Sequence, residues 1–338
     1  MQDVLIIGTG MAATALASAL AGKARVTLVE KSRGFGGRMA TRRREGFEFD
    51  HGAQFFTARS TEFKQFLAQP VEREAIQEWQ PRLTTLEAGR EPYKREWFEP
   101  HFVATPSMNS LCKESLKALE NNVEIILGCE VGSIEKIDIG NASCRWRVFS
   151  KQLDSTQEAL GEFDWILSAA PSAQTEALFT NTAFNHLDRL RDAVHLPCFS
   201  LMLGFDAPPK LSFDLATVKE SSVALIAANA SKPGRAASHS LLVHSDNHWA
   251  RKNFEGDRAE IQQQLIDETC SLLNLDAASI VHADLQGWRY AKTEIAAEED
   301  FLLDDARQLA ACGDWCLGGR IEDAFLSGHR LGNTLAKL

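Results

Sequence analysis

The sequence lacks the features of several protein classes. It has no stretch of about 18 uncharged apolar residues, so no membrane-spanning helix is expected. It has no internal repeat and no low-complexity tract, and its 44% hydrophobic and 24% charged residues exclude gross disorder and a collagen-like chain. The first residues carry no basic leader of a secretory signal, and we expect a cytoplasmic protein.

The cysteines do not have the spacing of a metal site, and the basic residues are too few for general binding to polyanions. The seven cysteines are scattered, and the close pair Cys312 and Cys316 has no second pair or histidine cluster nearby, so no zinc site, other metal site or disulfide framework is expected. The 36 basic residues are outnumbered by 46 acidic ones, and a net charge of −10 repels polyanions. We therefore expect no binding to nucleic acid or to anionic membranes. The oligomeric state stays open.

The N-terminus has the pattern of a dinucleotide-binding unit. An apolar strand over 4–7 precedes the turn Gly8-Thr9-Gly10-Met11-Ala12-Ala13, a helical segment over 14–21 and a second strand over 26–29 that ends at Glu30. Gly8 permits the tight turn, Gly10 lets the backbone approach a pyrophosphate, and Ala13 keeps the helix close to the sheet. The helix N-terminus favours phosphates, and Glu30 can accept hydrogen bonds from ribose hydroxyls. The alternative is a βαβ unit without a ligand.

The segment after Glu30 favours a flavin dinucleotide over a nicotinamide dinucleotide. It reads Lys31-Ser32-Arg33-Gly34-Phe35-Gly36-Gly37-Arg38-Met39. The doublet Gly36-Gly37 lets this loop lie against a cofactor, and Arg33 and Arg38 supply charge for its pyrophosphate. We interpret residues 42–44, three arginines, as a solvated turn, and residues 47–57 as a strand that enters a polar loop.

The far end of the chain predicts a second set of cofactor contacts. A short strand over 309–312 ends in Gly313-Asp314, which places a carboxylate near ribityl or phosphate-proximal hydroxyls. A last helix begins near residues 323–325, so the backbone at Ala324 and Phe325 would direct its N–H groups at the flavin pyrimidine ring. The helix dipole would stabilise the negative charge that develops there on reduction. Alternatively, Asp323 is an ordinary N-cap.

The middle of the chain indicates an inserted second domain. Strands over 200–205, 223–227 and 240–244 predict an antiparallel sheet that could cover the flavin, and the apolar spacing over 260–273 predicts an amphipathic helix. We expect an α/β fold with a discontinuous Rossmann-type FAD-binding domain, formed by residues 1–62, 101–172 and 292–338. The α+β substrate domain, built on the antiparallel sheet, would comprise 63–100 and 173–291.

Together these motifs resemble the flavin amine-oxidase superfamily, with its p-hydroxybenzoate hydroxylase-like cofactor domain, and within it the renalase family. The likeness rests on the glycine motifs at both ends and on the stretches 52–59, 231–235, 243–245 with Trp249, and 288–291. Two departures occur at substrate-domain positions. Ala227-Ala228-Asn229 lacks an expected tryptophan, and Gly287 stands where a basic residue is more usual.

The resemblance implies a cofactor and a reaction. FAD would be bound without a covalent bond, consistent with the lack of any cysteine between Cys270 and Cys312. The 1,2- and 1,6-dihydro isomers of NAD(P) would be oxidised to NAD(P)+, with hydride transfer to the flavin and reoxidation by O2 to H2O2. The resemblance also implies that the backbone of Val131 touches adenine. The expected cofactor-binding residues are Gly8, Gly10, Met11, Ala12, Ala13, Glu30, Lys31, Arg33, Gly36, Gly37, Arg38, Met39, Val131, Gly313, Asp314, Ala324 and Phe325.

A dihydronicotinamide already carries its hydride, so the site must mainly stack and orient the ring. The candidate catalytic residues are Gln54, Phe56, Thr57, Arg59, His244, Trp288 and Tyr290, although each could instead be a structural residue. The first rival is an amine oxidase or desaturase, which usually bears a lysine at the flavin, and Lys292 is the candidate for it. The second rival is a non-catalytic FAD-binding protein. The expected partners are the dihydronicotinamide dinucleotide and O2.

Overall fold

The two ends of the chain build one six-stranded sheet. The computed structural model describes all residues except 88, 95, 139–143 and 152–157. The strand order is β18-β19-β12-β1-β2-β8, and all neighbours pair in parallel except β18 with β19. The strands are β1 (Asp3–Ile7), β2 (Arg25–Glu30), β8 (Val123–Leu127), β12 (Trp165–Ser168), β18 (Leu302–Asp304) and β19 (Leu309–Ala311). The predicted Rossmann-type arrangement is therefore confirmed, because its strands were recognisable as short, uninterrupted apolar runs.

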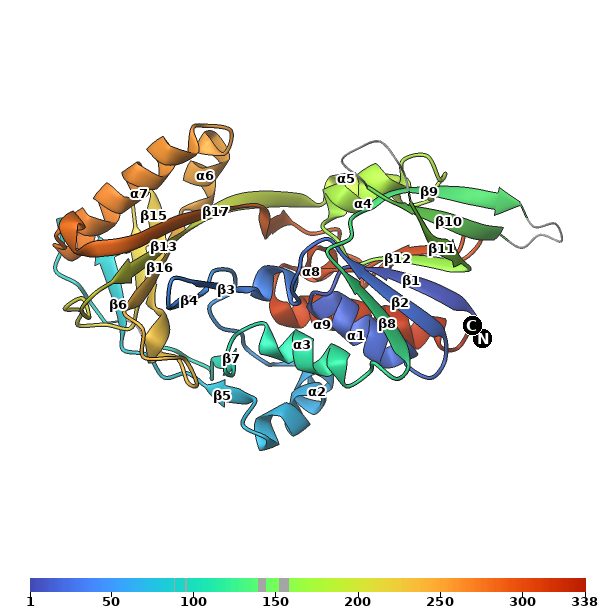
Figure 1. Ribbon diagram of the computed structural model, residues 1–338, viewed down its shortest axis with the longest axis horizontal. Helices are drawn as coiled ribbons and strands as arrows, with labels where there is room; N and C mark the ends of the chain where they lie inside the picture. The colour runs from blue at the N-terminus through green and yellow to red at the C-terminus, as the bar shows by residue number, and fades with distance from the viewer. Residues whose placement is uncertain (88, 95, 139–143, 152–157) are drawn as a thin grey trace.

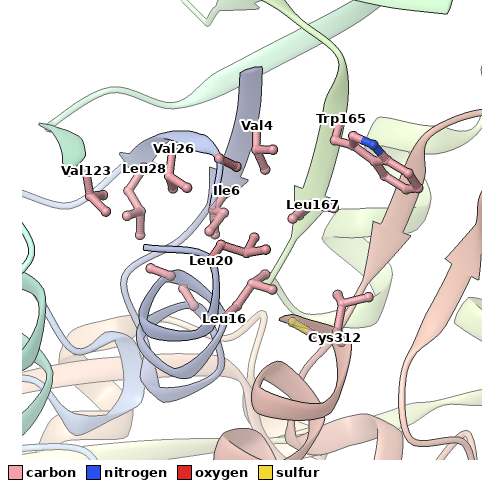
Figure 2. Close-up of a cluster of buried hydrophobic side chains, with 14 of the residues drawn as sticks. Val4, Ile6, Leu16, Leu20, Val26, Leu28, Val123, Trp165, Leu167 and Cys312 are labelled. Carbon is pink, nitrogen blue, oxygen red and sulfur yellow. The ribbon is translucent and has the colours of Figure 1, made fainter. Parts of the chain in front are cut away.

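Helices cover one face of this sheet. The helices α1 (Met11–Leu20), α3 (Ser110–Lys117) and α9 (Ile321–Leu335) lie together there (Figure 1). Figure 2 shows the core beneath them, where Leu16 and Leu20 of α1 approach Ile6, Leu28 and Leu167 of the strands.

The contact between α1 and α9 is close because small residues form it. A Cβ atom at Gly328 would lie 2.0 Å from the Ala12 carbonyl oxygen, and one at Gly332 would lie 2.6 Å from the Ala19 Cβ. A side chain at Gly328 would force the last helix away from the first. This packing holds the two chain ends in one unit.

A three-stranded sheet and short helices cover the other face of the first sheet. They are β9 (Val131–Asp138), β10 (Cys144–Ser150), β11 (Ala159–Phe163), α4 (Ser172–Phe179), α5 (Leu187–Asp192) and α8 (Asp314–Leu317). Phe179 of α4 and Leu190 of α5 are buried in the core on this side. The chain therefore crosses to the second sheet at Val194, later than the predicted boundary after residue 172.

The second sheet has six strands in the order β17-β13-β16-β15-β14-β6, antiparallel except for the pair β14 and β6. They are β6 (Leu83–Glu87), β13 (Val194–Phe205), β14 (Leu215–Lys219), β15 (Val223–Ala228), β16 (Ser240–Ser245) and β17 (Ile280–Ile295). The long strands β13 and β17 reach from this sheet back to the first domain (Figure 1). The predicted domain limit between 291 and 292 thus lies inside β17.

Each face of the second sheet packs on a different layer. Helices α6 (Asn247–Asn253) and α7 (Arg258–Leu273) cover the outer face, and Phe199, Leu201 and Val243 point into that core. Met202 and Leu242, which point the other way, pack on Phe49 of the hairpin β3 (Thr41–Arg44) and β4 (Phe47–Asp50). The inner face of the sheet therefore looks towards the first domain.

The interpretation of residues 42–44 as a solvated turn is wrong, because they belong to β3. The Arg42 guanidinium donates to the Asp284 carboxylate (2.8 Å) and to the Gln286 amide oxygen (2.6 Å) on β17. The Arg42 side chain therefore links the β3–β4 hairpin to β17 of the second sheet.

Three further elements lie along the lower edge of the molecule in the view of Figure 1. They are α2 (Thr61–Glu72), β5 (Ile76–Glu78) and β7 (Phe102–Ala104). Among the described residues, no helix combines the length and apolar character needed to cross a bilayer. The described His, Cys, Asp and Glu side chains form no group of three or more suited to a metal ion. The six described cysteine side chains are free thiols.

Candidate active site

Two glycine loops lie on each other at the carboxyl ends of β1 and β2. Gly8 has φ +109° and Gly36 has φ +103°, a region that side-chain-bearing residues rarely adopt. The Gly36 N–H donates to the Thr9 carbonyl oxygen at 3.0 Å. The N-cap residue of α1, Gly10, provides no side-chain cap, and no acidic residue lies in the first turn. The helix N–H groups are therefore available to an anion.

Glu30 ties these two loops together. Its side chain is buried at the end of β2, where it accepts hydrogen bonds from the Thr9 N–H (3.0 Å), the Thr9 hydroxyl (3.1 Å) and the Ser32 N–H (2.8 Å). A carboxylate offers about four lone-pair sites, so it has capacity for a ribose hydroxyl. Lys31 and Arg33 are exposed beside it.

Arg38 joins the glycine loop to the C-terminal motif, so the two segments that were predicted to bind the cofactor lie side by side. Its guanidinium makes a bidentate ion pair with Asp314, one bond being 2.8 Å, and donates to the Ala291 carbonyl oxygen at 3.3 Å. Burial opposes ionisation of Asp314, but the charge and hydrogen bonds of Arg38 outweigh it and hold the pKa of Asp314 below its ordinary value. Asp314 also accepts a hydrogen bond from the Thr293 hydroxyl at 3.4 Å.

The first turn of α9 is held by its own acidic residues. The N-cap residue is Arg320 and not Asp323 as the alternative interpretation had it; the Asp323 carboxylate, at the third helical position, accepts from the Arg320 N–H at 2.9 Å in a capping box. The Glu322 carboxylate accepts from the N–H groups of Arg59 (3.0 Å) and Ser60 (2.5 Å). These contacts orient the start of α9 towards the loop that precedes α2.

Several predicted cofactor residues are buried among other side chains. The ring of Phe325 packs 5.0 Å from the Phe63 ring and 4.8 Å from the Phe66 ring. The helix begins at Ile321, earlier than predicted, so the N–H groups of Ala324 and Phe325 are not the free ones of its first turn, and the Ala324 N–H donates to the Arg320 carbonyl oxygen at 3.1 Å. The side chain of Met39 is likewise buried, with its sulfur 3.9 Å from the Cys112 sulfur. Met11, Ala12, Ala13 and Gly313 are also buried, whereas Val131 and Ala324 are half-buried.

A charged network that the sequence analysis missed lies beside the loop after β4. Asp50, Lys232 and Arg235 have side chains that are 0% exposed. One Asp50 oxygen accepts from the Lys232 ammonium (3.0 Å) and from the Arg235 guanidinium (2.7 Å). The other accepts from the Thr41 hydroxyl (2.7 Å) and the Met108 N–H (3.1 Å). Residues 231–235 were noted only for their resemblance, because no local pattern shows that both cations point inwards.

Gln54 is part of this network. Its amide N–H groups donate to the carbonyl oxygens of Asp50 (2.5 Å) and Gly52 (2.8 Å), and its amide oxygen accepts from the Lys232 ammonium at 2.9 Å. Burial lowers the pKa of Lys232 to about 8, against the opposing attraction of Asp50. Both amide donors are used within the protein, so Gln54 acts on the loop rather than as a free ligand.

His244 and Trp288, two predicted residues, meet at this loop together with His51. The Trp288 indole N–H donates to the His51 carbonyl oxygen at 2.9 Å. The centroids of the Trp288 and His51 rings are 5.1 Å apart. The Nε2 atom of His244 is buried and has no partner among the described residues. Burial is the main cause that lowers the pKa of both His51 and His244 to about 4, so both imidazoles are neutral at pH 7.

A third neutral imidazole, His195, lies beside the ion pair of Arg38 and Asp314. Burial, followed by the charge of Arg38, lowers its pKa to about 4, and its buried Nε2 atom has no partner among the described residues. The predicted residue Tyr290 packs edge-on against it with ring centroids 5.6 Å apart. The sequence analysis missed His195, because a lone histidine at the start of a strand carries no motif.

The other candidate side chains lie away from this group. Arg59 forms an exposed ion pair with Glu99, the ring of Phe56 packs in the core 5.8 Å from that of Phe63, and Thr57 is half-buried. Lys292 is exposed, whereas the next residue, Thr293, points at Asp314. Since neighbouring strand residues point to opposite faces, Lys292 points away from the cofactor segments.

A cavity of about 230 Å³ lies beside Phe55 of the same loop. Phe55, which follows Gln54, forms one wall together with Trp97 and His101, and the inner face of the second sheet forms the other. Its lining residues are Phe55, Leu83, Thr84, Glu96, Trp97, Phe98, Glu99, His101, Leu215, Thr217 and Leu225.

Comparison with known proteins supports the fold. Residues 6–70 match the family described as NAD(P)-binding Rossmann-like domains. A crystal structure from Exiguobacterium sp. 255-15, provisionally named a protoporphyrinogen oxidase, has a TM-score of 0.76 at 13% identity, covering 99% of both chains. Wild-type putrescine oxidase bound to putrescine has a TM-score of 0.70 at 11% identity, covering 100% of this chain and 99% of that chain. A double mutant of that oxidase has a TM-score of 0.73 at 11% identity, with coverage of 100% and 99%. The chain therefore has a Rossmann-like domain within an overall fold like that of these solved structures.

Proposed function

We propose that this protein is an FAD-dependent oxidase of the renalase type. It would oxidise the 1,2- and 1,6-dihydro isomers of NAD(P) to NAD(P)+ and pass the electrons to O2, giving H2O2. The observation that carries the proposal is the group of neutral imidazoles and aromatic rings between the cofactor segments and the second sheet. The charged side chains beside that group, Asp50 and Asp314, are each held in ion pairs.

FAD fits the residues at the cofactor segments. The uncapped N-terminus of α1 and Arg38 would hold its pyrophosphate, and Glu30 would hold its adenosine ribose. The buried Nε2 atoms of His195 and His244 offer unused polar partners where the two sheets face each other. When bound, FAD supplies a two-electron acceptor that O2 can reoxidise. Burial raises the pKa of the Cys316 thiol to about 12, which disfavours a covalent link and supports non-covalent binding.

The residues at this site suit a substrate that already carries a hydride. Imidazoles with a pKa near 4 are weak bases, so they can donate or accept hydrogen bonds but remove protons poorly at pH 7. Trp288 and Tyr290 would provide flat apolar surface for the dihydronicotinamide ring, and His244 would orient its carboxamide. The hydride leaves the ring with both electrons, the ring becomes the pyridinium of NAD(P)+, and O2 takes two electrons and two protons.

An amine substrate is the second candidate, because putrescine oxidase shares the fold. The exposed position of Lys292 disfavours it, since this lysine cannot hold a water molecule at the flavin from the outer side of β17. A non-catalytic FAD-binding protein is the third candidate.

Anaerobic mixing tests the proposal. The FAD-loaded protein is mixed with β-NADH that contains 1,2- and 1,6-dihydro isomers, and flavin absorbance is followed, with purified 1,4-NADH as the control. We expect rapid partial bleaching limited by the isomer content, and one H2O2 per isomer after air is admitted. Bleaching by amines alone would establish the second candidate, and tight FAD binding without bleaching by any reductant would establish the third.

A further inference from the structure

We propose that the aromatic cavity beside the loop of residues 50–57 binds the adenosine end of the dinucleotide substrate. This inference rests on the proposed function, and it assigns the cavity to the part of the substrate that does not react.

One wall of the cavity is aromatic. The rings of Trp97 and His101 stack with centroids 3.6 Å apart, and the Phe55 ring meets the His101 ring edge-on at 4.5 Å. Trp79 backs this wall, with its centroid 6.0 Å from that of Trp97. These contacts hold the wall in place before a ligand binds, which lowers the entropic cost of binding.

The opposite wall is the inner face of the second sheet. Leu83, Leu215 and Leu225 line it from three neighbouring strands, β6, β14 and β15. An aromatic wall that faces a flat aliphatic wall forms a slot for a planar ring. Stacking on aromatic side chains is the usual way in which proteins bind a nucleobase without base-specific contacts.

The polar groups of the cavity are two carboxylates, two hydroxyls and the imidazole of His101, and the Glu99 carboxylate also pairs with Arg59. Glu96 and Glu99 lie at its rim, and Thr84 and Thr217 lie on the sheet side. Carboxylates accept hydrogen bonds and cannot donate them when ionised. Adenosine offers the matching donors, an exocyclic amino group and two ribose hydroxyls.

The position of the cavity fits a dinucleotide that reaches from the reacting site. Leu225 on β15 lies opposite His244 on β16 in the sheet register, so both point to the inner face. Trp288 lies on β17, three strands from β15, a separation of about 14 Å at about 4.8 Å per strand. The nicotinamide at Trp288 and the adenosine in the cavity would thus be held at two ends of one sheet face.

Binding of ADP-ribose to the FAD-loaded protein tests the cavity directly. Calorimetry should show binding to the wild type and at least about a tenfold weaker affinity for Trp97→Ala, because a stacking partner of the base is lost. The matched control is Tyr93→Ala, which removes an aromatic ring of the same segment that does not line the cavity. Thr217→Phe, which narrows the slot from the sheet side, should weaken binding as well. Flavin absorbance confirms that each variant is folded.

Kinetics separate this inference from the proposed function. The dihydro isomers of NAD should have a KM at least about tenfold lower than those of nicotinamide mononucleotide, and Trp97→Ala should remove most of that difference. Equal ADP-ribose affinity of the wild type and both cavity variants would overturn the inference. If no isomer reduces the flavin, the proposed function fails, while the ADP-ribose measurement still reports on the cavity.

Discussion

Replacing Asp50 by asparagine should expose the energetic cost of the buried charged network. Asp50 is the carboxylate partner of Lys232 and Arg235, and all three side chains are 0% exposed. The change keeps the size of the side chain but removes its charge. The Arg235 guanidinium would then remain buried without the carboxylate that pairs with it. Lys232 would be driven towards its neutral amine, because the charge of Asp50 no longer opposes the effect of burial on its pKa, and the loop that Lys232 holds through Gln54 would lose its anchor.

The expected loss is several kcal/mol. Removing one partner of a buried ion pair costs about 3–5 kcal/mol, because the remaining charge is desolvated and unpaired. For the 338-residue chain, an unfolding entropy of about 2.1 cal/mol/K per residue amounts to about 0.7 kcal/mol/K. The melting temperature should therefore fall by about 4–7 °C if the chain unfolds as one unit.

Thermal and urea unfolding of the purified protein measure this effect. The control is Asp188→Asn, which removes a carboxylate that pairs with Arg191 at the surface, where the Asp188 side chain is 94% exposed. Exposed pairs contribute about 1 kcal/mol or less, so this variant should melt near the wild-type temperature. Adding Lys232→Met to Asp50→Asn should restore part of the lost stability, because it replaces a buried amine that has lost its carboxylate partner by an apolar side chain.

A loss below about 1 kcal/mol, equal to that of the surface control, would refute the reasoning. It would mean that Arg235 and Lys232 find other partners or water once an amide replaces the carboxylate. The network would then have no part in holding the loop of residues 50–57 against the second sheet.

Three further predictions concern titration, cofactor affinity and packing. Because the folded pKa of His244 is about 4 and that of an unfolded histidine is about 6.5, the unfolded state binds more protons between these values. The free energy of unfolding, measured in urea, should thus fall as the pH drops from about 6.5 towards 4, and His244 should contribute at most about 1.4 kcal/mol per pH unit to this fall. An equally steep pH profile in His244→Gln would show that His244 is not its source. Glu30→Gln should weaken FAD binding at least about tenfold in a fluorescence titration, since a charged acceptor is lost, and wild-type affinity would argue against the assigned ribose contact. Gly328→Ala should lower stability by about 1–3 kcal/mol, opposite in sign to the usual effect of alanine in a helix, because its Cβ would meet the Ala12 oxygen at 2.0 Å. A stabilised variant would show that α9 can shift.

The first domain was predictable because its signals are local. The strand β1, the turn at Gly8 and the helix α1 follow one another within 20 residues, and hydrophobic periodicity marks each of them. The same holds for β13, β15 and β16, whose apolar runs predicted an antiparallel sheet that is confirmed. Their pairing order and the two long strands that connect the domains were not predictable from those runs.

The site was only partly predictable. Arg38 and Asp314 were proposed from separate motifs, and the structure joins them in one ion pair. His195 was missed, and Gln54 proved to be bonded within the protein, because the partners of each side chain come from distant segments.

The sequence by itself determined that this chain has a glycine-rich dinucleotide-binding unit and a second, antiparallel sheet, since a turn, a helix face and a strand face are set by neighbouring residues. Only the tertiary structure decided which charges are buried. Lys232 and Asp50 are 182 residues apart, and nothing near either residue predicts that the other will compensate its charge. A charged side chain can be buried only where folding brings a partner of opposite charge to it. Whether it is buried therefore depends on the tertiary structure and cannot be predicted from the residues next to it in the sequence.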